Sequence, residues 1–304
     1  MGDQVDGLVI VDKPGGITSH DVVSRMRRIA QTRRVGHAGT LDPMATGVLV
    51  LGLNRGTRLL HYLIGADKTY EATIRLGVTT TTEDVEGQIV QMIGAPHLNQ
   101  DQIEAAVGSL RGEIMQVPSA VSAIKVDGKR SYQRVRDGEE VALPPRRVRI
   151  EQFTWCNQRA GLAADDVAVT DIDVSVTCSS GTYIRALARD LGQALGVGGH
   201  LTRLRRTRVG NYSLGQSHSL EDLENVLKPL ALGPAAREIF PVRELTQREA
   251  RALSFGNWIA ASAGDPSGTK ERPVAGVNSA GELIALLATA GEEYRPVVVF
   301  APAP

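Results

Sequence analysis

Apolar and polar residues alternate along this chain in a way that predicts strands and helices in mixed order. The segment GLVIVDK at 7–13 is typical of a buried strand, and KTYEATIRLG at 68–77 alternates so that Tyr70 lies on its apolar face. Between them, apolar residues at helical spacing predict a helix over about 19–30, with Thr18 as N-cap of a capping box.

Further strands and helices follow the same two periodicities. Strands are predicted at VLVLGL, VRIEQFTWC, DIDVSVTCS and TRVGNYSL, and helices at TRLLHYLIG, LNQDQIEAAVGSLRG, TYIRALARDLGQAL and SLEDLENVL. The segment AVSAIKVDGKRSYQRVRDG predicts a strand, an Asp-Gly turn and a helix. The order shows no regular strand–helix–strand repeat and no glycine-rich phosphate loop. We therefore expect an α+β fold with a mixed, largely antiparallel central sheet flanked by helices.

The length of 304 residues allows a large core and a small second domain. Pro and Gly residues near 229–234 follow the last predicted helix, and the remaining sequence carries short strands such as RPVVVFAP. We predict two domains, 1–232 and 233–304, of which the second is compact and β-rich.

The composition is that of a soluble globular protein, and we expect it to be cytoplasmic. Hydrophobic residues make up 42% and charged residues 22% of the chain. No apolar run reaches the roughly 18 residues of a membrane span, and the N-terminus lacks a secretory signal pattern. We expect Cys156 and Cys178 to be small buried hydrophobes rather than a disulfide or a metal pair.

Basic residues are clustered although the net charge is zero. Residues 211–304 carry 8 basic and 11 acidic side chains, a net charge of −3, so residues 1–210 carry +3. Three basic clusters lie in that longer part: Arg25, Arg27, Arg28, Arg33 and Arg34; Lys125, Lys129, Arg130, Arg134 and Arg136; Arg203, Arg205, Arg206 and Arg208. Such clusters are solvated faces in many proteins, but together they also suit a phosphate backbone.

The stretch GHAGTLDPMATGVLVL at 36–51 places Asp42 before a proline in a glycine-bounded loop. Asp and Pro are common turn residues, so a plain turn explains this stretch without any function. A catalytic role needs in addition a cation that keeps the acid ionised and a pocket for a substrate.

Three other stretches carry candidates for these parts. Tyr70 in KTYEATIRLG is either a core aromatic or a pocket residue. Tyr183 and Arg185 lie at a predicted strand-to-helix turn, where an arginine can pair with a carboxylate. Lys13 in DKPGG is a fourth candidate, although lysines in such a segment are more often surface-turn residues without a function.

Six segments in fixed order resemble the TruB family of tRNA pseudouridine synthases. They are VDKPGGITSHDVV, RRVGHAGTLDPMATGVLVLGL, KTYEATIRLG, QVPSAVSAIKVDGKRSY, CSSGTYIRALARDLGQALG and HLTRLRRTRVG, within residues 7–215. The resemblance implies a pseudouridine synthase fold with a C-terminal PUA-like module. It implies a stand-alone, cofactor-free and metal-free enzyme that isomerises the T-loop uridine at tRNA position 55. We expect a cytoplasmic monomer that binds the tRNA T-loop and T-stem, without a membrane or an obligatory protein partner.

The same resemblance assigns the catalytic roles. It makes Asp42 the nucleophile, which attacks ribose C1′, attacks C6 of the uracil, or assists a glycal path. It pairs Arg185 with Asp42, which keeps the carboxylate ionised and aimed. It places Tyr70 against the target base, where the side chain stacks and serves in proton removal from C5.

The resemblance also assigns residues that bind the RNA. His37 fills the space that the flipped base leaves, although a histidine in a glycine-rich loop is by itself more often structural. Tyr183 and Leu204 line the uracil pocket, and Lys13 supports the active-site region or nearby phosphates. The contacts to the RNA backbone are assigned to Arg203, Arg205 and Arg206.

Other functions remain open from the residues alone. An RNA-binding tRNA folding factor needs the basic surface and His37 but not Asp42. A hydrolase of small substrates needs a metal or a second carboxylate, and we interpret the acids of EDVEG at 83–87 as a polar loop instead. A guide-RNA-dependent enzyme needs docking extensions, which the sequence does not show. Ser119 and Val121 replace the proline and tyrosine common in the family, which leaves the packing beside the pocket open.

Overall fold

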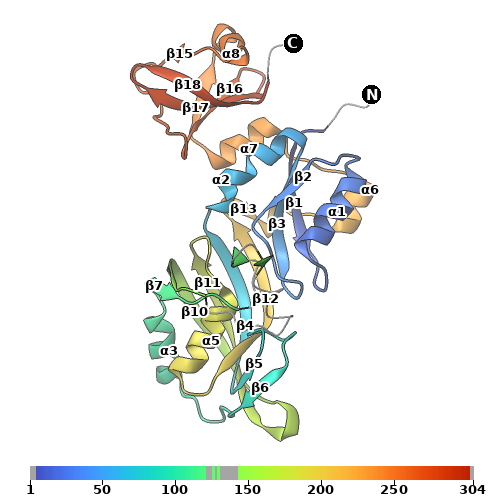
Figure 1. The fold of residues 1–304 in the computed structure, drawn as a ribbon, viewed down its shortest axis with the longest axis vertical. Helices are drawn as coiled ribbons and strands as arrows, with labels where there is room; N and C mark the ends of the chain where they lie inside the picture. The colour runs from blue at the N-terminus through green and yellow to red at the C-terminus, as the bar shows by residue number, and fades with distance from the viewer. Residues whose placement is uncertain (1–4, 121–124, 127–128, 131–142, 302–304) are drawn as a thin grey trace. The chain divides into compact units, whose positions relative to one another are not determined.

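The computed structural model describes residues 5–120, 125–126, 129–130 and 143–301 (Figure 1). The chain divides into two compact units. The first unit comprises Met1–Asp42, Val48–Ala66 and Val209–Pro304. The second comprises Pro43–Gly47 and Asp67–Arg208. This division places the N-terminal and C-terminal residues in the same unit. It therefore does not test the domain boundary at residue 232, which stays a prediction from the sequence.

The first unit begins with a small sheet covered by helices. Strand β3 (Thr46–Leu53) has β1 (Gly7–Lys13) as a neighbour and also pairs antiparallel with β2 (Val35–Ala38). The helical elements that surround these strands are α1 (Ser19–Ile29), η1 (Asn54–Arg58), α2 (Leu60–Ile64), η3 (Leu214–Gln216), α6 (Leu220–Asn225) and α7 (Leu232–Ile239), and the short strand β13 (Tyr212–Ser213) lies between them in sequence. Five of the seven residues of β1 are buried without interruption, because neighbouring elements cover both of its faces.

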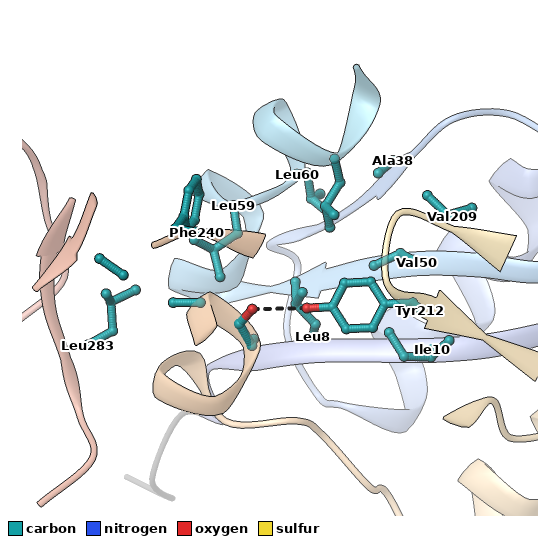
Figure 2. Close-up of a cluster of buried hydrophobic side chains, with 14 of the residues drawn as sticks. Leu8, Ile10, Ala38, Val50, Leu59, Leu60, Val209, Tyr212, Phe240 and Leu283 are labelled. Atoms are coloured by element: carbon teal, nitrogen blue, oxygen red, sulfur yellow. Dashed lines mark hydrogen bonds between the residues drawn. The ribbon is translucent and has the colours of Figure 1, made fainter. Parts of the chain in front are cut away.

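An apolar cluster joins the strands of this unit to its C-terminal part. Leu8, Val50 and Leu59 pack in it with Phe240 and Leu283, as Figure 2 shows. Tyr212 is fully buried in the same cluster, and its hydroxyl donates a 3.0 Å hydrogen bond to the carbonyl of Ala235. This bond satisfies the polar end of a side chain that otherwise lies among apolar neighbours.

The C-terminal part of the first unit carries its own five-stranded sheet. The strand order is β14 (Val242–Leu245), β16 (Val274–Asn278), β17 (Leu283–Ala290), β18 (Glu293–Val299) and β15 (Ile259–Ala260). Helix α8 (Gln247–Ser254) packs on this sheet, and Leu253 and Tyr294 belong to a second apolar cluster there. This part is therefore β-rich, as the sequence predicts.

The second unit is built on a mixed sheet. Its strands follow the order β12 (Gly199–Val209), β4 (Lys68–Leu76), β11 (Ala168–Cys178), β10 (Arg146–Leu162) and β7 (Gly112–Gln116). The last three pairings are antiparallel, whereas the first residues of β3 run parallel to β12. Helices α3 (Gln100–Ser109) and α5 (Ile184–Ala194) pack against each other and against β10 and β4 respectively (Figure 1).

Short elements complete this unit. They are the hairpin of β5 (Val78–Thr80) and β6 (Ile89–Met92), the pair β8 (Lys125–Val126) and β9 (Lys129–Arg130), and η2 (Ala164–Asp166). Gly47 lies where β3 approaches β12, with φ 102°; a Cβ there would lie 2.1 Å from the carbonyl oxygen of Arg206. Only glycine fits this position.

The α+β prediction with a mixed central sheet is confirmed, and two local predictions need correction. The segment TRLLHYLIG contains part of a 3₁₀ turn followed by a five-residue helix. Both cysteines are free, and Cys178 is buried, but Cys156 is exposed. The helix predicted after the Asp-Gly turn lies outside the described residues. No helix in the described part of the chain is both long and apolar enough to cross a bilayer.

Candidate active site

Asp42 lies in the loop between β2 and β3. These strands pair so that His37 faces Leu51 and Ala38 faces Val50 across the ladder. Gly39 leaves β2 with φ 85°, the left-handed conformation that starts the loop. The side chain of Leu41 is buried, and Asp42 beside it is half-buried. The carboxylate therefore stands on a loop with an apolar anchor rather than on a free tip.

Lys13 is fully buried at the end of β1. Its ammonium group donates hydrogen bonds to the carbonyl oxygens of Pro14 at 2.8 Å and Ile17 at 2.7 Å. These two bonds fix the turn that leads into α1. The burial corrects the surface-turn interpretation, while support of the active-site region or of nearby phosphates stays a prediction.

His37 is half-buried and meets a second histidine. Its ring and that of His20 on α1 have centroids 5.7 Å apart and an interplanar angle of 78°, an edge-to-face arrangement. The contact limits the orientations open to the His37 ring. The role of His37 in filling the space of a flipped base stays a prediction.

Tyr70 is buried on the face of β4 that it shares with Ala72 and Ile74. Lys68 lies two residues earlier on the same face and is 6% exposed. Burial, with the nearby charge of Arg206, lowers the pKa of Lys68 to about 8. The apolar face of β4 therefore carries one aromatic ring and one strongly desolvated cation.

Arg185 lies in the first turn of α5 and is 4% exposed. Its Nη1 donates a 2.9 Å hydrogen bond to the carbonyl oxygen of Thr82, and its Nε lies 3.6 Å from Oδ2 of Asp84. Asp84 is itself 3% exposed, and its Oδ1 accepts hydrogen bonds from the Thr82 hydroxyl and the backbone N–H of Glu86. The carboxylate thus meets a buried guanidinium, which is the partner such a group needs.

The segment EDVEG is a polar loop, as the sequence predicts, but two of its acids are paired with arginines of α5. Besides the Asp84 pair, Glu83 accepts a 2.6 Å hydrogen bond from Nη1 of Arg189 on α5. The hydroxyl of Ser119, which is buried, donates to the same carboxylate. The serine that departs from the family pattern therefore has a local partner; Val121 lies outside the described residues.

Tyr183 is the N-cap residue of α5, and its backbone is held from β7. The side-chain amide of Gln116 accepts from the Tyr183 N–H at 2.9 Å and donates to the Tyr183 carbonyl at 3.1 Å. The guanidinium of Arg146 lies over the Tyr183 ring, with Cζ 5.4 Å from the ring centroid. Among the described residues, no carboxylate pairs with Arg146, whereas its neighbour Arg147 pairs with Glu113 at 3.4 Å.

Strand alternation separates the predicted residues of β12 into two sets. Leu204 and Arg206 are buried, 5% and 1% exposed, whereas Arg203 is exposed and Arg205 is partly buried. The Nε of Arg203 donates to the Thr73 hydroxyl, and Nη1 of Arg205 to the Thr46 hydroxyl. Arg206 is enclosed in this structure, and its assignment to the RNA backbone stays a prediction.

The predicted residues therefore fall into one group in each unit. Lys13, His37 and Asp42 belong to the first unit. Tyr70, Tyr183, Arg185 and Leu204 belong to the second. Within the described residues, no group of three or more His, Cys, Asp or Glu side chains is arranged to hold a metal ion.

Comparison with solved structures identifies the class of fold. A chain of the archaeal box H/ACA sRNP Nop10–Cbf5 complex aligns with a TM-score of 0.69 and 25% identity, covering 97% of this chain and 86% of that one. A chain of a Cbf5–Nop10–Gar1 complex gives a TM-score of 0.69 and 27% identity, covering 97% and 85%. The architecture is that of a pseudouridine synthase.

Family models and curated relatives then define the family. The TruB family pseudouridylate synthase N-terminal domain matches residues 27–184, the tRNA pseudouridylate synthase B C-terminal domain 185–234, and the tRNA pseudouridine synthase II C-terminal domain 240–301. Proteins named tRNA pseudouridine synthase B are 58% identical in Paenarthrobacter aurescens and 54% in Mycobacterium leprae. The alignments cover 98% and 97% of this chain and 96% and 91% of those proteins. This chain belongs to the TruB family of pseudouridylate synthases and is an isomerase.

Proposed function

We propose that this enzyme converts the T-loop uridine at position 55 of tRNA to pseudouridine, with Asp42 as the nucleophile. The names of the curated relatives, which align over nearly their whole length, support tRNA as the substrate. The position within the tRNA and the role of Asp42 are what the resemblance of the segment GHAGTLDPMATGVL to the TruB family implies.

The observation that carries the proposal is the placement of Asp42, which is half-buried, on a loop anchored by the buried side chain of Leu41. The reaction breaks the bond between ribose C1′ and uracil N1, turns the base, and joins C1′ to C5 without gain or loss of atoms. A held carboxylate attacks C1′ or C6, or assists a glycal path, and each of these routes uses its negative charge.

Arg185 supplies the cation that the mechanism requires. Its guanidinium is buried and held by Asp84 and by the carbonyl of Thr82, so its position is determined before any substrate binds. We propose that it pairs with Asp42 and keeps that carboxylate ionised. Asp84 acts through Arg185 as a positioning residue.

The second unit provides residues suited to a flipped uracil and its phosphates. In the proposal, Tyr70 stacks on the base and Tyr183 and Leu204 line the pocket, while His37 occupies the space that the base vacates. Arg203 and Arg205 contact the RNA backbone. Arg146, which sequence reasoning missed, is suited to a phosphate because its guanidinium lies over an aromatic ring and meets no carboxylate in the described residues.

The remaining parts of the proposal concern the setting of the reaction. We propose that the enzyme acts in the cytoplasm as a monomer, without an obligatory protein partner, and binds the T-loop and T-stem. The β-rich C-terminal part acts as a PUA-like module. The net charge of −3 over residues 211–304, which include this part, argues for a structural role or weak RNA contact rather than for strong phosphate binding.

Release of tritium from tRNA labelled at uracil C5 tests the proposal. Wild-type enzyme is expected to release tritium, and Asp42→Asn is expected to bind tRNA normally but release none, because the lost charge acts in the transition state. A tRNA with cytidine at position 55 is expected to abolish release. Equal release by wild type and Asp42→Asn would refute the role of Asp42. Release that persists with the cytidine tRNA would refute the position.

The same variant separates this function from that of a tRNA folding factor. If tRNA folding depends on the protein but not on Asp42, and no tritium is released by the wild type, folding is the function and catalysis is excluded.

A further inference from the structure

The serine of the segment KPGGITSH makes a contact that joins the start of α1 to the loop of Asp42. The Ser19 hydroxyl donates a 3.1 Å hydrogen bond to the carbonyl oxygen of Leu41, and the backbone N–H of Leu41 donates to the same hydroxyl at 2.9 Å. One side chain therefore satisfies both backbone polar groups of the residue that precedes Asp42. Ser19 is fully buried, so water does not compete for these bonds.

The helix itself does not need this hydroxyl. Thr18 is the N-cap of α1: its hydroxyl accepts from the Asp21 N–H at 3.1 Å, and the Asp21 carboxylate accepts from the Thr18 N–H at 2.8 Å. The capping box is complete without Ser19. The Ser19 side chain is thus used for a residue 22 positions further along the chain.

The bond to the Leu41 carbonyl acts directly on Asp42. The carbonyl of Leu41 and the backbone nitrogen of Asp42 belong to the same rigid peptide plane. Fixing the carbonyl oxygen fixes the direction in which the backbone enters Asp42. On the other side, Pro43 restricts the backbone angles of the residue before it. The base of the Asp42 side chain is held from both directions.

The support behind Ser19 is rigid. Val22, Val23 and Met26 bury one face of α1, which packs on β2. The buried ammonium of Lys13 fixes the turn that leads into the helix. The chain leaves the first unit directly after Asp42, so this clamp attaches the carboxylate to the first unit.

We propose that Ser19 is a positioning residue that aims the Asp42 carboxylate by clamping the Leu41 backbone. This inference rests on the proposed catalytic role of Asp42. A displacement of about 1 Å of a reacting group lowers rates by about 100-fold. Loss of the clamp is therefore expected to slow the chemical step while leaving tRNA binding intact.

Single-turnover measurements of tritium release with saturating enzyme test this inference. Ser19→Ala is expected to be slower by about 10- to 100-fold, with a tRNA dissociation constant within about twofold of wild type. Thr18→Ala is the matched control, because it removes a hydroxyl from the adjacent residue and weakens the same helix without contact to Leu41. It is expected to keep the wild-type rate at a temperature where circular dichroism shows both variants folded.

A second variant keeps the test decisive if Ser19→Ala does not fold. Ser19→Cys fills similar space with a weak donor and acceptor and is expected to give an intermediate rate. A folded Ser19 variant with the wild-type rate, or equal slowing by Thr18→Ala, would overturn the inference. Asp42→Asn, measured in parallel, separates the two proposals: if it is inactive while Ser19→Ala is fully active, only the clamp is refuted.

Discussion

We predict that Lys68 makes a contribution to the stability of the protein that increases with pH. The pKa of its ammonium group is lowered from 10.5 to about 8, first by burial and second by the charge of Arg206. Below pH 8 the folded protein carries this charge at a cost, because the unfolded chain binds the same proton more tightly. The cost disappears as pH rises from 8 to 10.5. The contribution of Lys68 to stability therefore increases with pH over this range.

The size of the effect follows from the two pKa values. A difference of one pKa unit corresponds to about 1.4 kcal/mol, so the full cost is on the order of 3 to 4 kcal/mol, and most of it is relieved between pH 7 and pH 10. Lys68→Met keeps the length of the side chain but cannot titrate. Between pH 7 and pH 10, the free energy of unfolding of wild type should therefore rise relative to that of Lys68→Met by most of this cost.

Urea unfolding of both proteins at pH 7, 8.5 and 10 measures this shift. Burial raises the pKa of the Cys178 thiol to about 11, which acts in the opposite direction, but both proteins retain this group and its effect largely cancels. Lys270→Met replaces an exposed lysine and serves as control, with no expected shift. A wild-type to Lys68→Met difference that stays constant within about 0.5 kcal/mol across this range would refute the reasoning.

Two further predictions concern the reaction and the RNA. Asp84→Asn removes the negative partner of Arg185 and is expected to slow single-turnover tritium release by about 10- to 100-fold with unchanged tRNA affinity. Asp101→Asn, on the exposed face of α3, is the control and should have no effect. A wild-type rate for Asp84→Asn would contradict the positioning role of Asp84. Arg146→Ala is expected to weaken tRNA binding and to reduce the slope of log affinity against log salt by about one, as for one lost phosphate contact. Arg147→Ala, whose arginine already pairs with Glu113, is the control, and equal slopes for wild type and Arg146→Ala would exclude the contact.

Local signals in the sequence were sufficient for most elements of the fold. The capping box of Thr18 and Asp21 forms at the predicted start of α1, and the predicted alternation in β4 buries Tyr70. These features depend on residues a few positions apart, where spacing alone decides which side chains meet. The mixed sheet also follows, because the predicted order of strands and helices excludes a regular parallel arrangement.

Contacts between residues that are distant in the sequence could not be predicted from such spacing. Asp84 and Arg185 are far apart in sequence, and nothing in EDVEG indicates that one of its acids is buried against α5. The hydrogen bonds of Ser19 to the Leu41 backbone cannot be predicted from periodicity either. The burial of Arg206 is different, because strand alternation in HLTRLRRTRVG already places it on the face of Leu204.

Four buried polar side chains share a physical pattern in how they hold the loops around the candidate site. Lys13, Ser19, Gln116 and Arg185 are all buried polar side chains that bind the backbone of a loop or a helix start. Such bonds satisfy backbone groups that have no partner in a helix or sheet, and so they fix loops that regular structure leaves unconstrained. Each unit therefore orders its own part of the candidate site with its own side chains. We therefore expect Lys13→Met or Gln116→Ala to slow single-turnover tritium release, because each removes side-chain hydrogen bonds that fix the backbone of a loop or a helix start.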